Sequence, residues 1–364
     1  MPSHRIALVT AAAARELDDD LAPLESALRD AGANVATPNW DDAACNWSNF
    51  DLALLRSPWD YTQRLAEFLA WAERAAQATR LLNPLGVIRW NTDKHYLHDL
   101  QKSGVAIVPS LFVEPGEDAV AALAGFLSAH AVDEFVVKPA IGAGSRDAQR
   151  YHRDEHATAT AHVRRLIDAK RSVLLQPYLA RVDEHGETAL LFFDGKFSHA
   201  IRKGPLLKRG EGPTRALFAA EHITPREPHA AELALAGRAL AAIPFAGPLL
   251  YARVDPIQHA DGMPRLLERD PLFVTGVRRI VAIIAEGLVE YFAHFLFVVG
   301  MGEDVGAVLA DAVENPHADH VGLHAEFVDF RQPLDRLVVD RLHLALQFDG
   351  TDVVASVVVA LDQP

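Results

Sequence analysis

A lysine followed by small residues marks one stretch of the sequence, Phe135–Tyr151, as suited to a polyphosphate. The apolar run 135–137 predicts a buried strand, and Lys138 comes directly after it. Small or flexible residues then follow at Ala140, Gly142, Ala143, Gly144 and Ser145. Backbone N–H groups of such a loop can approach phosphates closely, and the lysine supplies a point charge. The stretch contains no Walker A motif, and taken alone it also fits an ordinary strand and surface hairpin.

Further residues suited to nucleotide chemistry follow this stretch or precede it in the chain. Lys94 is expected at the start of a helix, and Gln176–Leu179 resembles a connector that offers backbone groups to a base edge. Asp255 and Glu268 are expected on the two strands of a hairpin, where a pair of carboxylates suits Mg²⁺. Arg202 and Lys203, next to Gly204, would stabilise charge on a transferring phosphoryl group.

Strand–helix alternation in the first 88 residues predicts a small α/β domain with a parallel sheet. The expected strands are Arg5–Thr10, Val35–Trp40, Leu52–Leu55 and Leu81–Asn83, and the expected helices are Leu17–Ala31 and Leu65–Ala78. Ligands of such sheets bind beyond the carboxyl ends of the strands, where this sequence has Thr10 and the run Arg56–Tyr61. This run, with Trp59, Asp60 and Tyr61 close to Arg56, is either a substrate-binding loop or a surface loop anchored by Trp59.

The next part of the chain is predicted to contain helices and two hairpins. The expected helices are Asn91–Ser103, Ala119–His130, Ala157–Ala169 and Pro228–Ala242, with further strands at Leu111–Val113 and Val173–Leu175. Asn91 or Thr92 is suited to cap the first of these helices, which places Lys94 in its first turn. Asp194-Gly195 and Asp261-Gly262 are the turns of the two hairpins.

Composition argues against several classes of protein. The formal net charge of −14 makes nucleic-acid binding an unfavourable hypothesis. Cys45 is the single cysteine, which suits the reducing cytoplasm. We expect no secretion signal, and charged residues that interrupt the apolar region Ile280–Val299 argue against a membrane span. Residues 271–364 contain 5 arginines against 14 acidic residues, but their apolar runs argue against a disordered tail.

The order of these parts, over roughly residues 5–273, resembles the ATP-grasp ligase family. The resemblance is closest to its cycloserine-forming branch, which contains O-ureido-D-serine cyclo-ligase. It is carried by RSPWDY (56–61), RWNTDK (89–94), VVKPAIGAGSRD (136–147), LLQPYL (174–179), GETALLFFDGKFSHAIRKGP (186–205) and YARVDP (251–256). The motif set is specific for ATP-grasp and less specific for the cycloserine reaction.

The resemblance implies an α/β fold that becomes α+β in its C-terminal part. A pre-ATP-grasp domain with a parallel sheet would span residues 1–90. A central ATP-grasp subdomain with the phosphate loop would span 91–180, and a C-terminal subdomain with the metal site would span 181–273. Residues 274–364 would form an acidic tail without a counterpart in the family.

The resemblance also implies roles for individual residues. Lys94 and Lys138 would contact the phosphates of ATP, covered by the loop at Gly142, Gly144 and Ser145. Gln176, Tyr178 and Leu179 would surround adenine, with Asp183 or Glu187 nearby for the ribose. Mg²⁺, or Mn²⁺ in its place, would bind Asp255, Glu268 and Asp270, although Arg269 departs from the family's pattern. Arg202, Lys203 and Arg253 would be catalytic, and Thr10, Arg56, Trp59, Asp60 and Tyr61 would bind the substrate.

ATP-grasp enzymes phosphorylate a carboxylate, and a nucleophile, commonly an amine, then displaces the phosphate. We therefore expect an ATP- and Mg²⁺-dependent ligase for a small amino-acid-like carboxylate, with ring closure as in the conversion of O-ureido-D-serine to D-cycloserine, an antibiotic. An intermolecular carboxylate–amine ligase and a nucleotide-binding protein without turnover are the alternatives. The expected partner is the small-molecule substrate, without nucleic acid or membrane, and a homo-oligomer is compatible with the sequence.

Overall fold

The structure is a computed structural model that describes residues 4–213, 222–245, 249–270, 321–328, 339–349 and 352–361. Residues 269 and 270 and the last three ranges are described by their backbone. The chain divides into two compact units, Met1–Val281 and Ala282–Pro364. Each unit is described by itself.

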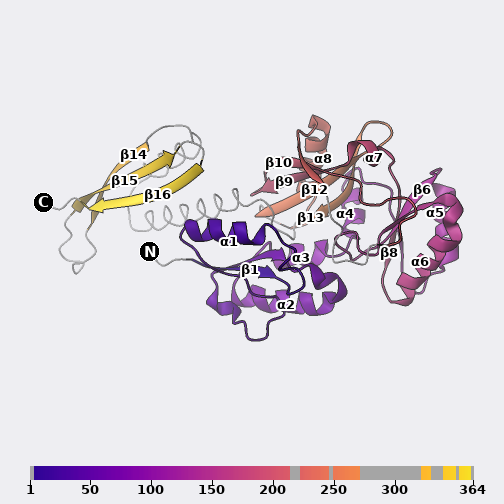
Figure 1. Cartoon of the computed structure of the whole chain (residues 1–364), viewed down its shortest axis with the longest axis horizontal. Helices are drawn as coiled ribbons and strands as arrows, with labels where there is room; N and C mark the ends of the chain where they lie inside the picture. The colour runs from indigo at the N-terminus through magenta and orange to yellow at the C-terminus, as the bar shows by residue number, and fades with distance from the viewer. Residues whose placement is uncertain are drawn as a thin grey trace. The chain divides into compact units, whose positions relative to one another are not determined.

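A parallel four-stranded sheet, in the order β2-β1-β3-β4, opens the first unit. The elements are β1 (Arg5–Thr10), α1 (Leu21–Asp30), β2 (Asn34–Ala36), the 3₁₀ helices η1 (Trp47–Asn49) and η2 (Trp59–Gln63), β3 (Leu52–Ser57), α2 (Leu65–Ala78) and β4 (Arg80–Leu82). Figure 1 shows α1 and α2 on opposite sides of β1, which explains why β1 is buried from Ile6 onward. The predicted parallel sheet is confirmed. The first helix begins later than predicted, and Leu17 is exposed in the turns before it.

A four-stranded antiparallel sheet follows, in the order β5-β8-β6-β7. Its strands are β5 (Leu111–Val113), β6 (Glu134–Pro139), β7 (Gln149–His152) and β8 (Val173–Pro177). The helices α5 (Ala119–Ala129) and α6 (His156–Asp168) pack on it around Phe126, Phe135 and Leu166 (Figure 1). Lys138 therefore lies within a strand, and the loop after it leads into a strand, β7, that the sequence did not predict.

The helix predicted for Asn91–Ser103 is wrong in its first half. One helix, α3 (Leu85–Asn91), ends at Asn91, and another, α4 (Tyr96–Lys102), begins five residues later. The Asp93 side chain accepts a hydrogen bond from the His95 N–H at 3.1 Å, which favours a turn over continued helix. Lys94 thus lies in a turn between two helices.

The third sheet is five-stranded and antiparallel, in the order β11-β10-β9-β12-β13. Its strands are β9 (Glu187–Phe193), β10 (Lys196–Lys203), β11 (Ile223–Arg226), β12 (Tyr251–Gln258) and β13 (Pro264–Asp270), with α7 (Arg181–His185) before them and α8 (Ala230–Ala241) packed on them. Both predicted hairpins are present. Asp194 and Gly195 have φ values of 49° and 72°, as a tight two-residue turn requires.

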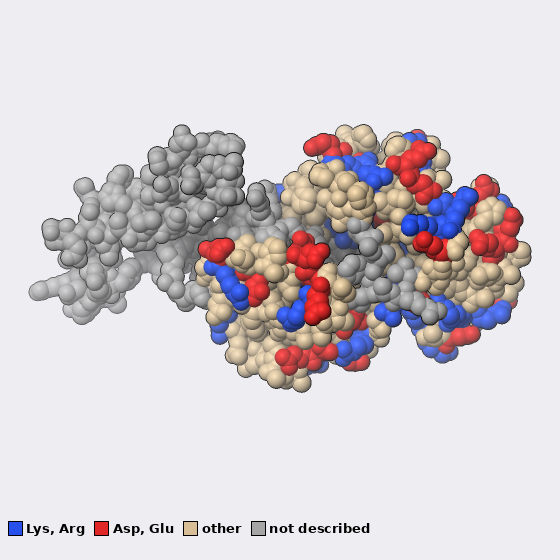
Figure 2. Space-filling view, in the orientation of Figure 1, with Lys and Arg blue, Asp and Glu red and all other residues tan. Residues whose placement is uncertain are grey.

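The second unit contains an antiparallel sheet in the order β14-β15-β16, with β14 (Val321–Val328), β15 (Val339–Asp349) and β16 (Asp352–Leu361). The apolar region Ile280–Val299 lies outside the described residues. Among the helices that the structure describes, none is both long enough and apolar enough to cross a bilayer. On the face shown in Figure 2, acidic and basic side chains of the described residues are interspersed.

Candidate active site

Three lysines and three carboxylates meet between the second and third sheets of the first unit. Each comes from a different element, so the site depends on the folding of both sheets. The members are Lys94 from the turn before α4, Lys138 from β6, Glu187 from β9, Lys203 from β10, Asp255 from β12 and Glu268 from β13. We call these six residues the charge cluster. Its cationic and anionic side chains lie next to each other and are partly buried.

Lys94 connects the charge cluster to the loop after β6. Its Nζ lies 2.9 Å from Glu268 Oε1 and donates to the Gly142 carbonyl at 2.6 Å. Its backbone N–H donates to the Ala140 carbonyl at 3.0 Å. The Lys94 ammonium therefore binds a residue of this loop and a predicted metal ligand at the same time.

Lys203 forms ion pairs with two other carboxylates of the charge cluster. Its Nζ lies 2.7 Å from Glu187 Oε1 and 3.1 Å from Asp255 Oδ2. Arg253 Nε also donates to Asp255, at 2.9 Å to Oδ1. Because Asp255 and Glu268 are paired residues of the β12–β13 ladder, their carboxylates come from neighbouring positions.

The ionisation of these groups depends on their neighbours. Burial lowers the pKa of Lys138, and nearby Lys94 adds to this effect while Glu268 opposes it. Burial disfavours charge on Glu268, but Lys94 and Lys138 outweigh it and lower the pKa of Glu268 to about 2. Burial raises the pKa of Glu187, against the effect of Lys203. Strong perturbation of several neighbouring groups is typical of functional sites.

Gly186 allows the strand that carries Glu187 to approach Lys203. It has a φ of +70°, and a Cβ atom there would lie 2.5 Å from the Lys203 carbonyl oxygen. Any other residue would be strained in φ and would push β9 away from β10. The close approach of Glu187 to Lys203 therefore rests on this glycine.

The loop after β6, residues 140–148, is attached at both ends, and we call it the flap. Gly144 and Ser145 at its tip both have a φ of 60°. Asp147 is bound by Arg165 at 3.0 Å and by Arg171 at 2.6 Å. Two further flap residues, Ile141 and Ala143, pack against the core of the N-terminal sheet, as Trp59 does. The flap thus joins the charge cluster to the predicted substrate loop.

The predicted adenine-binding residues lie at the end of β8 and just beyond it. The Gln176 side chain is buried and donates to Ser110 Oγ at 2.9 Å. Tyr178 and Leu179 join Leu267 in packing against a small apolar cluster that includes Val108 and Ile257. The connector is therefore apolar on one side, as the face of a purine requires.

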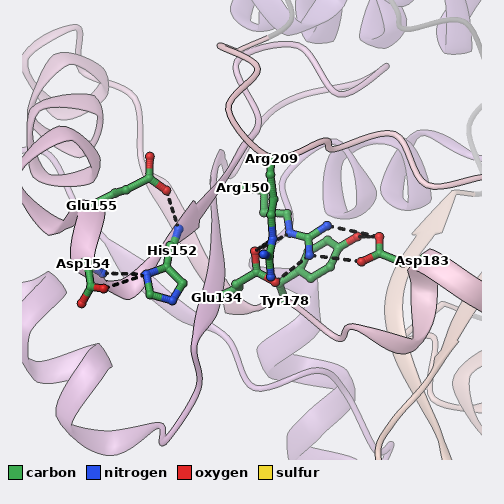
Figure 3. A network of polar contacts seen from close by, with 8 residues as sticks. All are labelled: Glu134, Arg150, His152, Asp154, Glu155, Tyr178, Asp183 and Arg209. Carbon is green, nitrogen blue, oxygen red and sulfur yellow. Dashed lines mark hydrogen bonds and ion pairs between the residues drawn. The ribbon is translucent and has the colours of Figure 1, made fainter.

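A polar network surrounds Tyr178 (Figure 3). The Arg150 guanidinium lies 3.5 Å from the centroid of the Tyr178 ring and donates to both Glu134 and Asp183. The Tyr178 hydroxyl also donates to Asp183, at 2.5 Å. Arg209, from the segment after β10, reaches Glu134 at 2.6 Å. Asp183 thus holds Tyr178 and Arg150, whereas Glu187 lies in the charge cluster, next to the lysines that are predicted to bind phosphate.

The predicted substrate-binding residues lie at the carboxyl ends of β1 and β3. The Thr10 and Ser57 hydroxyls are hydrogen-bonded to each other at 2.8 Å. Arg56 is buried and forms ion pairs with Asp18 and Asp20. Asp60 accepts a hydrogen bond from Trp40 Nε1 at 2.8 Å, and burial raises the pKa of its carboxyl group. Tyr61 is buried in the same core. Their contacts with substrate stay a prediction.

Arg202 binds the end of a helix, and Asp270 is described by its backbone alone. Arg202 donates to the carbonyls of His185, at 2.8 Å, and Glu184, at 3.1 Å, at the end of α7. Asp270 is the last residue of β13, opposite Arg253, and its side chain lies outside the described residues. In the described part of the chain, no group of three or more His, Cys, Asp or Glu residues is arranged to hold a metal ion.

Sequence reasoning missed the residues that hold the site together. Glu114 and Ser172 lie between the turn of Lys94 and the flap, and Arg150 lies on Tyr178. Ser172 and Arg150 lie close to the quoted motifs in the sequence, whereas Glu114 lies near none of them. Asp93 and His95 flank Lys94, for example, but neither spacing nor periodicity shows that they bind each other.

Comparison with known proteins identifies the family. Residues 6–83 match the family model described as the N-terminal domain of D-cycloserine synthetase DcsG. The chain is 43% identical over 270 residues to the cycloserine biosynthesis protein DcsG of Streptomyces lavendulae, which covers 73% of this chain and 90% of that protein.

Solved structures agree with this result. The crystal structure of D-cycloserine synthetase DcsG superposes with a TM-score of 0.71 at 40% identity, covering 78% of this chain and 99% of that one. A RimK domain ATP-grasp protein of Sphaerobacter thermophilus superposes with a TM-score of 0.55 at 15% identity, over 78% of this chain and 98% of that one, which supports the fold alone. The predicted ATP-grasp fold is confirmed, and the chain belongs to the D-cycloserine synthetase DcsG family.

Proposed function

We propose that this protein is an ATP-dependent ligase that activates a small amino-acid-like carboxylate as an acyl phosphate and then closes a ring through a nitrogen of the same molecule. The charge cluster is the observation that carries this proposal. Three lysines and three carboxylates lie together beneath a glycine-containing flap, which suits a polyphosphate and a divalent cation. Membership of the DcsG family supports the ring-closing form of the reaction.

The lysines on the flap side, Lys94 and Lys138, bind the phosphates in this proposal. Burial disfavours the charged form of Lys138, and a phosphate beside it would restore that charge. Lys94 reaches the flap carbonyl of Gly142, so it is placed to hold the flap and a phosphate together. Gly144 and Ser145 at the flap tip would cover the transferred group.

Asp255 and Glu268 provide the donors that a magnesium ion requires. They offer carboxylate oxygens from paired positions, and Mg²⁺ commonly uses one or two carboxylates together with phosphates and water. Each is paired with a cationic side chain, which supports a role for both carboxylates as ligands of a cation. A bound Mg²⁺ would neutralise charge on the phosphates; Asp270 is a third candidate ligand, and Mn²⁺ serves as a spectroscopic substitute.

The nucleoside lies at the connector in this proposal. Tyr178 and Leu179 contribute apolar surface beside adenine, and Gln176 holds the strand end through Ser110. Asp183, which is bound by Arg150 and Tyr178, and Glu187, which is bound by Lys203, are the two candidate ribose ligands. The flap brings this nucleotide site next to the N-terminal loop with Trp59, where the carboxylate substrate would bind together with Thr10, Arg56, Asp60 and Tyr61.

Activation and ring closure proceed in two steps, after which water removes the carbamoyl group of O-ureido-D-serine as carbon dioxide and ammonia. A substrate carboxylate oxygen attacks the γ-phosphorus of ATP, the bond to the β-phosphate oxygen breaks, and ADP leaves. A substrate nitrogen then attacks the acyl carbon, inorganic phosphate leaves, and the nitrogen loses a proton. Lys203 and Arg253 lie next to Asp255 and are placed to stabilise the phosphoryl oxygens. Arg202, bound to the end of α7, would act there only after releasing His185.

A phosphate-release assay with mass spectrometry of the products tests this function. We expect O-ureido-D-serine, within a panel of amino acids, to release phosphate. Ring closure removes one water, and hydrolysis of the remaining carbamoyl group to carbon dioxide and ammonia gives D-cycloserine, so the product should be lighter than the substrate by one carbon dioxide and one ammonia. A product that joins two substrates would establish intermolecular ligation instead. Calorimetry that shows no ATP binding in the presence of Mg²⁺ would refute both, and binding without phosphate release across the panel would favour a nucleotide-binding protein.

The single Cys45 and the need for ATP support a cytoplasmic location, and sedimentation would show whether the protein forms a homo-oligomer.

A further inference from the structure

The turn that carries Lys94 is held by a ring of contacts outside the charge cluster. His95 follows Lys94 directly, and its Nδ1 lies 2.6 Å from Asp93 Oδ1 while its Nε2 lies 2.9 Å from Glu114 Oε1. The other Glu114 oxygen accepts a hydrogen bond from Ser172 Oγ at 2.5 Å. Carboxylates thus face both ring nitrogens of His95.

The same contacts lead back to Lys94 through the base of the flap. The Ser172 carbonyl accepts a hydrogen bond from the Ala140 N–H at 2.9 Å. The Ala140 carbonyl in turn accepts the Lys94 N–H at 3.0 Å. The path from Lys94 through Ala140, Ser172 and Glu114 therefore returns at His95, the neighbour of Lys94 in the chain. Every link except the peptide bond is a hydrogen bond or ion pair.

We infer that His95 is a positioning residue, which holds the turn of Lys94 against the base of the flap so that the ammonium lies where phosphate binds. This inference rests on the proposed function, since it assumes that Lys94 binds phosphate. In the proposed site His95 would contact neither nucleotide nor substrate. It acts through Glu114 and Ser172, and its ring is kept in place by stacking on Phe112, with the ring centroids 4.0 Å apart.

The double contact requires a protonated imidazole. Only the imidazolium has an N–H on both nitrogens, so a neutral His95 would direct a lone pair at one of the two carboxylates. Asp93 on its own turn and Glu114 after β5 are the charged groups that face it; from α4 the ring of His98 lies 6.4 Å away, and Ser172 presents a hydroxyl.

The direction of the pH dependence follows from the pKa of His95. Burial lowers that pKa, but Asp93 and Glu114 outweigh burial and raise it above its ordinary value. The stabilising contact is therefore fully present below a pH of about 6.5 and is lost as the pH rises through the raised pKa. The turn of Lys94 should loosen over that interval.

The variant His95→Gln tests the inference, with His98→Gln as the matched control. His98 lies on α4 and contacts the same Phe112 ring, but in the described part of the chain it has no carboxylate partner. In wild type we expect the KM for ATP to rise about tenfold across the titration of His95, with a smaller change in kcat. We expect His95→Gln to have the high KM at every pH and His98→Gln to retain the wild-type profile. A wild-type pH profile of KM in His95→Gln would overturn the inference.

Hydrogen exchange without nucleotide provides a second readout. The protection factor of the peptide that contains Lys94 should fall in His95→Gln and in Glu114→Gln, and in wild type at high pH, because the N–H bond to Ala140 opens. Unchanged protection in both variants would refute the positioning role, whether or not ATP binds. If protection falls in the variants but the protein does not bind ATP, the positioning role of His95 is supported and only the proposed function is refuted.

Discussion

Two groups of buried charges in this chain are organised in different ways. In the N-terminal sheet, Arg56 and Asp18 have 3% and 1% exposed side chains and belong to one domain. In the charge cluster, six groups come from six elements, and Glu268 keeps 32% of its side chain exposed. The first arrangement is suited to hold a fold together. The second has cationic partners that a ligand can replace, which is what a nucleotide site needs.

Lys138→Ala tests the charge cluster and should have the largest effect. We expect turnover of ATP to fall by about a thousandfold, because a half-buried cation beside the transferred phosphate is lost while the strand β6 is retained. Phosphate release measures the effect, and circular dichroism shows whether the fold persists. Lys196→Ala, on an exposed position of β10, is the matched control. Wild-type turnover in Lys138→Ala would overturn the assignment of this site.

Arg56→Met tests the buried ion pair of Arg56 and Asp18 in the N-terminal sheet. We expect the free energy of unfolding to fall by about 3–5 kcal/mol, because Asp18 would remain buried without its partner. Urea denaturation measures this loss, and the double variant with Asp18→Leu should recover much of it. If Arg56 instead binds the substrate carboxylate, the single variant would keep its stability and raise the KM for the amino-acid substrate.

Lys94→Met tests whether a ligand can replace a cationic partner in the charge cluster, and we expect a smaller effect than in the two variants above. The Lys94 ammonium lies 2.9 Å from Glu268, so in the proposed site it would compete with a metal ion for that carboxylate until phosphates drew it away. Without nucleotide, we expect the variant to bind Mn²⁺ on the order of tenfold more tightly than wild type, measured by electron paramagnetic resonance. Lys102→Met, on an exposed position of α4, is the control. Equal Mn²⁺ affinity in Lys94→Met and wild type would show that Lys94 does not occupy the metal site.

Much of the fold could be predicted from local signals. The alternation of strands and helices predicted the parallel sheet, and Asp194-Gly195 predicted the hairpin of β9 and β10. Both predictions depend on residues that lie near each other in sequence. The helix predicted for Asn91–Ser103, with Lys94 in its first turn, was wrong in its first half because the Asp93 side chain binds the backbone of His95. The spacing of apolar residues in a helical pattern does not report that a side chain competes for the backbone hydrogen bond.

The candidate site was predictable in its members and less so in its contacts. Lys94, Lys138, Asp255 and Glu268 were identified from motifs, and the structure brings them together. The ring through Glu114 and Ser172 spans 58 positions in the chain between those two residues, and no local pattern reports such a pairing. Long-range side-chain contacts of this kind require the folded chain.

The packing of the flap limits how this protein can be recombined with its relatives. Ile141 and Ala143 rest on the core that belongs to the N-terminal sheet, although they are encoded far from it. A chimera that receives residues 6–83 from another family member would therefore inherit a mismatched surface beneath the flap. Exchange of the N-terminal domain should be accompanied by exchange of positions 141 and 143 if the hybrid is to bind nucleotide normally.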